Sequence, residues 1–144
     1  MALKVELKPG ERIILGESVV TNAGQRTRLL IEGAVAILRE KDIMTPERAD
    51  SPAKRVYLAV QLMYTARVPS IHHDIYFKLI GEFLAAAPSA WPIIETINSE
   101  ILTGNLYKAL KEARRLIAYE EELIAHAKRR AGLRQDREGD RSAA

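Results

Sequence analysis

The sequence predicts an α+β fold, in which a small N-terminal antiparallel β-sheet packs with a C-terminal bundle of about four helices. Apolar and polar residues alternate in short runs over the first 40 residues, which is the spacing of half-buried strands. After residue 50 the apolar residues recur every three or four positions, as in amphipathic helices. Because strands come first and helices second with no long linker between them, we expect the helices to cover one face of the sheet. The expected organisation is a sheet subdomain at 1–44, a helical subdomain at 45–131 and a flexible basic tail at 132–144.

The strands are predicted from short apolar runs that are separated by turn residues. The first run, over residues 3–7, alternates apolar with charged side chains and is followed by Pro9-Gly10. Further strands are expected at residues 12–15, 18–21, 27–31 and 34–38. Glycine adopts positive φ without a Cβ clash, so Glu32-Gly33 is expected to form a turn between the last two strands as antiparallel neighbours.

Capping residues and prolines mark the start and end of four predicted helices. Ser51-Pro52 offers a capping hydroxyl followed by proline at the first helical position, and later helices are expected from about Ser70, Ser89 and Asn105. Gly104 is expected to end the third helix in a left-handed conformation. The predicted inner faces are Val56, Val60, Met63 and Tyr64 on the first helix, Ile75, Leu79, Ile80 and Phe83 on the second, Ile93, Ile94, Ile97 and Ile101 on the third, and Leu106, Leu110, Ala113, Leu116, Ile117, Leu123 and Ile124 on the last.

The composition is that of an ordinary globular protein. The chain has 144 residues, of which 47% are hydrophobic and 28% charged, and it contains no cysteine. Disulfides, thiolate catalysis and thiolate metal sites are therefore excluded. No apolar stretch is long enough to span a bilayer and the N-terminus does not resemble a secretory signal, so a cytoplasmic protein without membrane contact is expected.

The net charge of +3 comes entirely from the C-terminal end. Residues 1–50 contain eight basic and eight acidic side chains, and residues 51–127 again contain eight of each. The remaining residues contain six basic and three acidic side chains. The body of the protein is neutral, so bulk charge gives little support for nucleic-acid binding.

Catalytic and ligand-binding motifs are missing from the sequence. There is no glycine-rich phosphate loop, nucleophile elbow or zinc-protease helix, so we expect neither an enzyme nor a cofactor. His72-His73-Asp74 resembles a set of metal ligands, but adjacent residues of a helix point in different directions, and a polar first helical turn is the preferred interpretation. Trp91 is expected to pack on the core at a helix start rather than to stack on a ligand.

A cluster of basic residues follows the last predicted strand. The basic residues between positions 39 and 55 are Arg39, Lys41, Arg48, Lys54 and Arg55. The planar guanidinium group of arginine hydrogen-bonds phosphate and stacks on unpaired bases, so an arginine at a strand end is a candidate for binding single-stranded RNA. Acidic neighbours leave the alternative of an exposed, ion-paired junction open.

Four runs in the chain resemble the FlbT family of flagellar regulators in order and spacing. They begin at Leu7, Leu38, Tyr107 and Arg115, and the most specific is the Leu-Arg-Glu-Lys-Asp-Ile-Met run at residues 38–44. The resemblance covers nearly the whole chain except the tail. It implies post-transcriptional control of flagellin through binding of the 5′ untranslated region of its mRNA.

A second resemblance concerns only the N-terminal strands. The order from Gly10 through Gly33 to residues 35–40 is similar to the carbon storage regulator family of RNA-binding translational repressors, in which a strand-ending arginine contacts RNA. The matching residue is Arg39, and its partner on the first strand falls near Leu3 and Lys4, although Leu38 stands where that family has histidine. This resemblance also implies a homodimer formed through the strands.

Two functional hypotheses follow. In the first, Arg39 and Lys41, helped by Lys4, Arg48, Lys54 and Arg55, bind a flagellin mRNA leader and alter its translation or decay. In the second, the protein is an interaction module or chaperone-like adaptor whose helices bind flagellin or FlaF, the genetic partner that the resemblance to the FlbT family implies, so that effects on mRNA are indirect. The neutral body favours the second hypothesis, and the Arg39 region favours the first.

Overall fold

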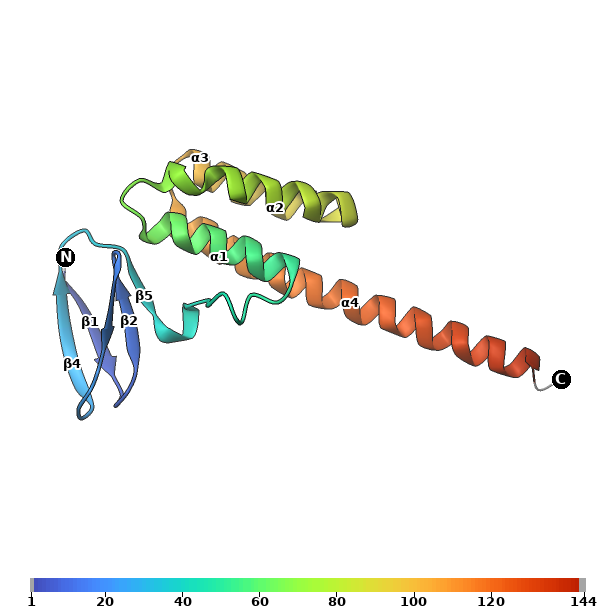
Figure 1. Cartoon of the computed structure of the whole chain (residues 1–144), viewed down its shortest axis with the longest axis horizontal. Coiled ribbons are helices and arrows are strands. Elements are labelled where there is room, and N and C mark those ends of the chain that lie inside the picture. The colour runs from blue at the N-terminus through green and yellow to red at the C-terminus, as the bar shows by residue number, and fades with distance from the viewer. Residues whose placement is uncertain (1, 143–144) are drawn as a thin grey trace.

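The computed structural model describes the backbone of residues 2–142 and the side chains as far as residue 132. The strands are β1 (Ala2–Leu7), β2 (Arg12–Leu15), β3 (Ser18–Thr21), β4 (Thr27–Glu32) and β5 (Ile37–Arg39). The helices are α1 (Pro52–Thr65), α2 (His73–Ala86), α3 (Trp91–Leu102) and α4 (Leu106–Ser142), with short 3-10 turns at Glu40–Asp42, Pro69–His72 and Pro88–Ala90. Strands at one end and helices at the other confirm the predicted α+β class (Figure 1).

The strands form two antiparallel sheets rather than the single sheet that was expected. β1 pairs with β4, and β2 lies between β3 and β5 in a separate three-stranded sheet. The expected hairpin around Glu32-Gly33 is wrong, because β4 and β5 belong to different sheets. Gly33 does have a positive φ of 117°, but the chain there crosses from one sheet to the other instead of reversing within one.

The three-stranded sheet is covered on both faces. Ile13 contacts Val5 and Leu7 of the two-stranded sheet, and these three buried residues form a small core between the sheets. On the opposite face, Leu38 is buried in the core of the helices with Ile14 packed against it. The helices therefore cover one face of this sheet, as expected, through β2 and β5, because side chains alternate between the two faces along a strand.

The helical core is built around α1, which packs against α2 on one side and α4 on the other, while α3 packs against α4. The predicted inner faces of α1 and α3 are confirmed in their main buried residues, which are Val56, Val60, Met63, Ile94, Ile97 and Ile101. On α2 the expectation for Ile75 is wrong: its side chain is 46% exposed and Tyr76 is fully buried instead. Ile80 and Phe83 are buried as predicted, so the inner face of α2 is formed by Tyr76, Ile80 and Phe83.

The start of α1 and the end of α3 agree with the capping signals, whereas Ser70 and Ser89 lie in the 3-10 turns before α2 and α3 and neither helix has a side-chain cap. The Ser51 hydroxyl accepts a hydrogen bond from the Lys54 backbone N–H at 3.3 Å, with Pro52 at the first helical position. A second acceptor was not foreseen: the buried Glu120 carboxylate of α4 accepts the Ala53 N–H at 2.9 Å. Gly104 follows α3 with a φ of 79°, as predicted. The start of α1 is therefore fixed to the middle of α4.

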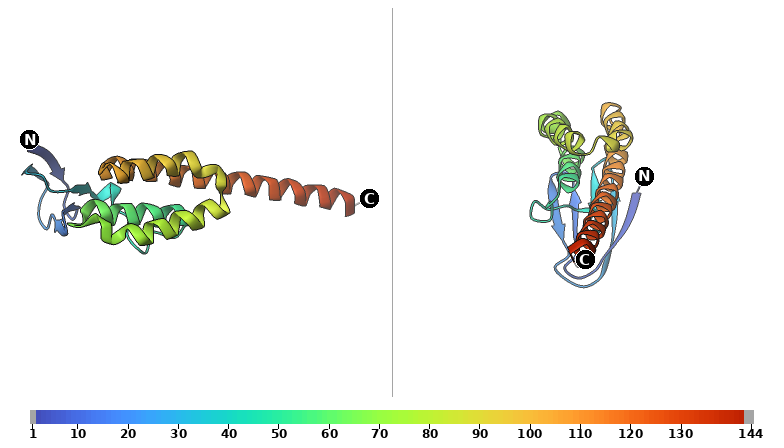
Figure 2. Two further views of the ribbon diagram at one scale, coloured as in Figure 1. Left: turned by 90° about the horizontal axis from the view of Figure 1, so that it is seen from above. Right: turned by 90° about the vertical axis from the view of Figure 1, so that its right-hand side faces the viewer.

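Helix α4 is much longer than its neighbours. It has 37 residues, or about 55 Å at 1.5 Å per residue, and it extends well past α1, α2 and α3 (Figure 2). The N-terminus and the end of α4 consequently lie at opposite ends of the molecule (Figure 1). The backbone from residue 132 to residue 142 continues α4, whereas residues 143 and 144 lie outside the described residues. The flexibility of the tail stays a prediction.

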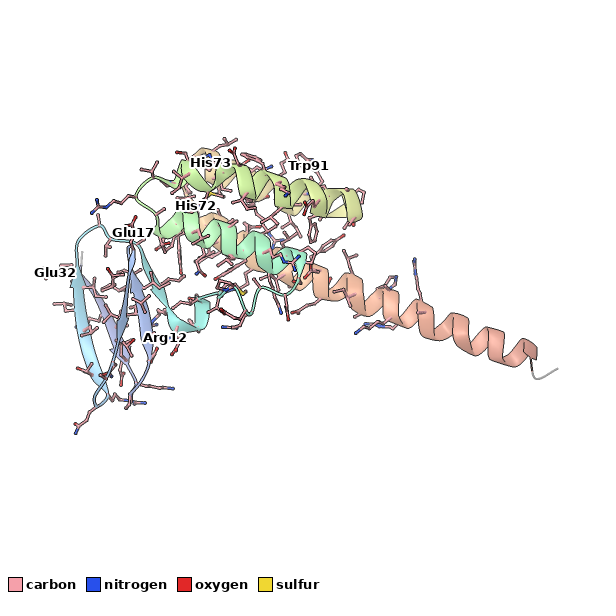
Figure 3. The ribbon with its side chains drawn as sticks, in the orientation of Figure 1. Arg12, Glu17, Glu32, His72, His73 and Trp91 are labelled. Atoms are coloured by element: carbon pink, nitrogen blue, oxygen red, sulfur yellow. The ribbon has the colours of Figure 1, made fainter. Side chains whose placement is uncertain are left out.

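Trp91 does not pack on the core as expected. Its side chain is 48% exposed at the first residue of α3 (Figure 3). The neighbouring Ala90, which is fully buried, occupies the core position at this helix start.

Within the part of the chain that the structure describes, no helix has both the length and the apolar composition needed to cross a membrane.

Candidate nucleic-acid interface

The residues at the end of β5 face a groove of about 820 Å³ between the two sheets, which we call the basic groove. Arg39 lies opposite Ile13 of β2, on the face of the three-stranded sheet that points toward the two-stranded one. The lining residues are Glu6, Lys8, Pro9, Gly10, Glu11, Arg26, Arg39, Glu40 and Lys41. The groove therefore combines the strand end that the sequence singled out with the turn between β1 and β2.

Asn22 holds one side of the basic groove in place. Its side-chain Nδ2 donates to the carbonyl oxygens of Leu7 and Lys8 at 3.1 Å each and to that of Gln25 at 2.9 Å. Its backbone N–H donates to the Glu11 carbonyl at 2.9 Å. One asparagine thus ties the β1–β2 turn to the loop that carries Arg26. The sequence pattern did not identify Asn22 as a residue that positions the groove.

Four cations and three carboxylates line the basic groove, but they are not equally available. Arg26 pairs with Glu6 at 3.3 Å, and Glu40 pairs with Arg12 from outside the groove at 3.6 Å. Glu11 accepts the backbone N–H of Lys8 at 2.9 Å. Within the described residues, Lys8, Arg39 and Lys41 form no ion pair and all three are exposed, and Arg39 and Lys41 lie at the end of β5. These two side chains are therefore free to bind an anion.

The other predicted site residues lie outside the basic groove. Lys4 is exposed on β1 opposite Leu30, in a different sheet from Arg39. Arg48 donates to the Ile43 carbonyl at 3.2 Å. Lys54 pairs with Asp50 at 3.1 Å, and this hydrogen bond holds the pKa of the Asp50 carboxyl below its usual value. Arg55 lines a separate cavity between α1, α2 and α4. The structure brings only Arg39 and Lys41 together.

A row of polar side chains on α1 fastens the segment that carries Arg39 and Lys41. The Tyr64 hydroxyl accepts the Ile37 backbone N–H at 3.3 Å and donates to the Ile37 carbonyl at 3.1 Å. Gln61 accepts the Met44 N–H at 2.7 Å and donates to the Met44 carbonyl at 3.0 Å. These residues lie on one face of the helix and hold the backbone on both sides of the basic pair.

Asp42 joins the same segment to two helices. The Tyr57 hydroxyl of α1 donates to the Asp42 carbonyl at 2.5 Å, and the Arg114 guanidinium of α4 binds the Asp42 carboxylate. The hydrogen bond that Arg114 donates to Asp42 raises the pKa of Arg114, and burial raises the pKa of the Tyr57 hydroxyl. The sequence pattern placed Tyr64 on the inner face of this helix without indicating its hydrogen bonds, and it did not single out Tyr57 or Gln61; the available signal was a glutamine within an otherwise apolar helix face.

The comparison with family models decides which family this arrangement belongs to. A model described as Flagellar protein FlbT matches residues 3–124, which include both sheets, the basic groove and most of the helical bundle. The chain belongs to the FlbT family. The resemblance drawn from the sequence runs is thereby confirmed.

Curated FlbT relatives are similar over most of their length. A Bradyrhizobium diazoefficiens protein named probable flagellum biosynthesis repressor protein FlbT 1 is 64% identical over 124 residues, covering 85% of each chain. A Rhodopseudomonas palustris protein named probable flagellum biosynthesis repressor protein FlbT is 52% identical over 125 residues, covering 87% of this chain and 99% of the relative. The Caulobacter vibrioides flagellum biosynthesis repressor protein FlbT is 34% identical over 129 residues, covering 88% and 92%. These names describe regulators, not enzymes.

No solved structure matches this FlbT chain. The comparisons also give no support for the resemblance to the carbon storage regulator family, which stays a hypothesis. Within one chain, Arg39 and the expected partner region at Leu3 and Lys4 belong to different sheets.

The histidines do not form a metal site in the described residues, where no three His, Asp or Glu side chains are grouped closely enough to hold a metal ion. His72 ends a 3-10 turn and His73 begins α2 (Figure 3). The ring of His73 packs edge-on against Phe77 at 6.3 Å between centroids, which is a packing role.

Proposed function

We propose that this FlbT protein represses flagellum biosynthesis after transcription by binding the 5′ untranslated leader of flagellin mRNA in the basic groove. The observation that carries the proposal is the placement of Arg39 and Lys41: both are exposed, free of ion pairs within the described residues and lie on one groove. A guanidinium and an ammonium group on a backbone that α1 holds in place can bind successive phosphates of a single strand. The FlbT names of the relatives, which call them repressors, support the regulatory part.

No chemical step is part of this proposal. The bound protein changes the access of ribosomes or nucleases to the leader, so regulation depends only on the affinity of the protein for the RNA. The electrostatic share of that affinity falls with salt, because binding releases counterions from the RNA.

Leader binding is tested by measuring the affinity of purified protein for a flagellin leader RNA at increasing salt. For Arg39→Ala with Lys41→Ala, we expect the affinity at low salt to fall about tenfold or more, as expected for losing hydrogen bonds to charged groups. The slope of log affinity against log salt should become shallower by about 1.4, which is about 0.7 for each lost phosphate contact on a single strand.

The matched control is Arg67→Ala with Lys78→Ala, which removes two exposed cations from the helical part and the same amount of charge. This control should retain the wild-type slope. Equal losses in both double variants would show that binding follows net charge rather than the basic groove, and the site assignment would then be wrong.

The second candidate, an interaction module that binds FlaF or flagellin, has one specific observation in its favour. A cavity of about 290 Å³ lies between α1, α2 and α4, and its apolar lining includes Leu79, Phe83, Leu123 and Ile124. A helix of a partner protein can bind in such a groove. Wild-type protein that binds FlaF or flagellin but no leader RNA at low salt would favour this candidate.

A further inference from the structure

A second groove lies at the opposite end of β5 from the basic groove. Its volume is about 520 Å³, and we call it the tyrosine groove because Tyr64 and Tyr107 line it. The remaining lining residues are Ala34, Val35, Ala36, Gly104, Asn105, Leu106 and Lys108. Val35 and Arg39 are four residues apart, so the two grooves are separated by about 13 Å of extended chain.

The most prominent group in the tyrosine groove is the ring of Tyr107. Tyr107 is the second residue of α4 and is 46% exposed, whereas its neighbour Leu106 packs against the helical core. The ring lies 5.7 Å from that of Tyr64 between centroids, at an angle of 43°. Tyr64 is itself fixed by its hydrogen bonds with Ile37, so Tyr107 rests on an ordered support.

Cationic and polar groups surround this ring. Lys111 Nζ lies 4.8 Å from the centroid of Tyr107, and Lys108 and Asn105 are exposed beside it. Ala34, Val35 and Gly104 also line the groove, and their side chains are small or absent. Both lysines have long, flexible side chains that can reach a phosphate next to the ring.

We propose that the tyrosine groove binds an unpaired base of single-stranded RNA, stacked on Tyr107, with the adjoining phosphate bound by Lys108 and Lys111. This inference rests on the proposed function and adds a second subsite to it. Exposed aromatic rings beside lysines are the means by which proteins hold single-stranded bases without reading a paired helix. The basic groove then supplies phosphate contacts at one end of β5, and the tyrosine groove supplies stacking at the other.

The inference is tested with a fluorescently labelled, single-stranded 12-nucleotide RNA of mixed sequence. Tyr107→Leu removes the ring but keeps an apolar side chain, and we expect the affinity to fall about 5- to 150-fold, the range measured for losing one base–aromatic stack. Tyr107→Phe keeps the ring and should bind within about twofold of wild type, since stacking requires no hydroxyl. The salt slope should not change in Tyr107→Leu, because stacking releases no counterions.

The outcomes separate this inference from the proposed function. If wild-type protein binds the RNA and Tyr107→Leu binds equally well, the tyrosine groove is not a base subsite, and the basic groove stands. If wild-type protein binds no RNA, both proposals fail.

A measurement on the wild-type protein covers the case in which Tyr107→Leu does not fold. RNA of the same length that carries 4-thiouridine is crosslinked by light to the bound protein, and the crosslinked peptides are identified by mass spectrometry. A crosslink to the peptide that contains Tyr107 supports the inference. Crosslinks confined to the peptides around Arg39, or crosslinks that avoid Tyr107 altogether, overturn it.

Discussion

The position of the candidate site depends on neutral polar side chains that do not themselves line the basic groove. Gln61 is buried, and both ends of its amide are used by the backbone of Met44. Asn22 connects two loops on the other side of the basic groove. Arg39 and Lys41 lie between the attachment of Gln61 at Met44 and that of Tyr64 at Ile37. These neutral side chains therefore position the two cations together with the Asp42–Arg114 ion pair.

Replacing Gln61 tests this dependence. Gln61→Leu keeps the size of the side chain but leaves the N–H and carbonyl of Met44 without partners, so we expect a loss of about 1–3 kcal/mol in the free energy of unfolding. Amide hydrogen exchange at residues 37–44 should also accelerate. Gln25→Leu, at an exposed glutamine in a loop, is the control and should change stability by no more than about 0.5 kcal/mol. Equal stability of the two variants would contradict the role given to Gln61.

At the scale of helices and strands, the helix ends show which capping residues in the sequence determine where a helix begins or ends. Ser51 and Pro52 start α1 as the sequence predicted, and Gly104 ends α3. The Thr45-Pro46 site has a similar sequence but forms only a turn, in which the Thr45 carbonyl accepts the Ala49 N–H at 3.0 Å. The two sites differ in a tertiary contact, because only the start of α1 has a second hydrogen-bond acceptor, the Glu120 carboxylate of α4.

Alanine substitutions at two glycines are expected to change the free energy of unfolding in opposite directions. Gly104 has a φ of 79° and an added Cβ meets nothing within 4 Å, so Gly104→Ala should cost about 1 kcal/mol through backbone strain alone. Gly81 lies within α2 and is equally open, so Gly81→Ala should stabilise the protein by about 0.5–1 kcal/mol. Both values come from denaturant unfolding. A shift of the same sign in both variants would rule out the backbone explanation.

At the scale of the whole molecule, two cores are joined by β2 and β5. The inter-sheet core contains Val5, Leu7 and Ile13, and the helical core contains the remaining large buried side chains. β5 belongs to both: Leu38 is buried among the helices while Ile37 packs on the inter-sheet core. Since both grooves lie at the ends of β5, this strand also determines the spacing of the two proposed RNA contacts.

From the buried Tyr76 in the helical core, we predict how the stability of the protein changes at alkaline pH. Burial raises the pKa of Tyr76, whose hydroxyl donates to Asn98 at 2.6 Å. Tyrosine in an unfolded chain ionises near pH 10, so above about that pH the unfolded state releases a proton that the folded state keeps. The stability contributed by the protonated tyrosine is complete below about pH 10 and falls as the pH rises beyond it.

Tyr76→Phe checks this expectation by urea unfolding at several pH values from neutral to strongly alkaline. The variant should lose stability less steeply than wild type above pH 10, since it has one fewer buried hydroxyl to ionise. Phe83→Leu, which disturbs the same core without removing a titratable group, should keep the wild-type slope. A Tyr76→Phe slope equal to that of wild type would show that this residue does not control the alkaline transition.

The sequence by itself determined the class of the fold, the order of the strands and helices and most of their boundaries, because periodicity and capping are local properties. It also identified the family, through runs of residues that need no structure to be recognised. It singled out Arg39 and Lys41, since a strand-ending arginine beside a lysine is visible in the chain.

Only the tertiary structure decided which strands pair, because the pairing partners β1 and β4 or β2 and β5 are chosen by packing between distant segments. The same holds for the site. Three of the other predicted site residues follow Arg39 closely in the sequence, namely Arg48, Lys54 and Arg55, and Lys4 was predicted from the resemblance to the carbon storage regulator family. Ion pairs, hydrogen bonds and strand pairing nevertheless place all four outside the basic groove. The tyrosine groove exists only because α4 brings Tyr107 to Tyr64 of α1, 43 residues earlier in the chain, and no local pattern records that contact.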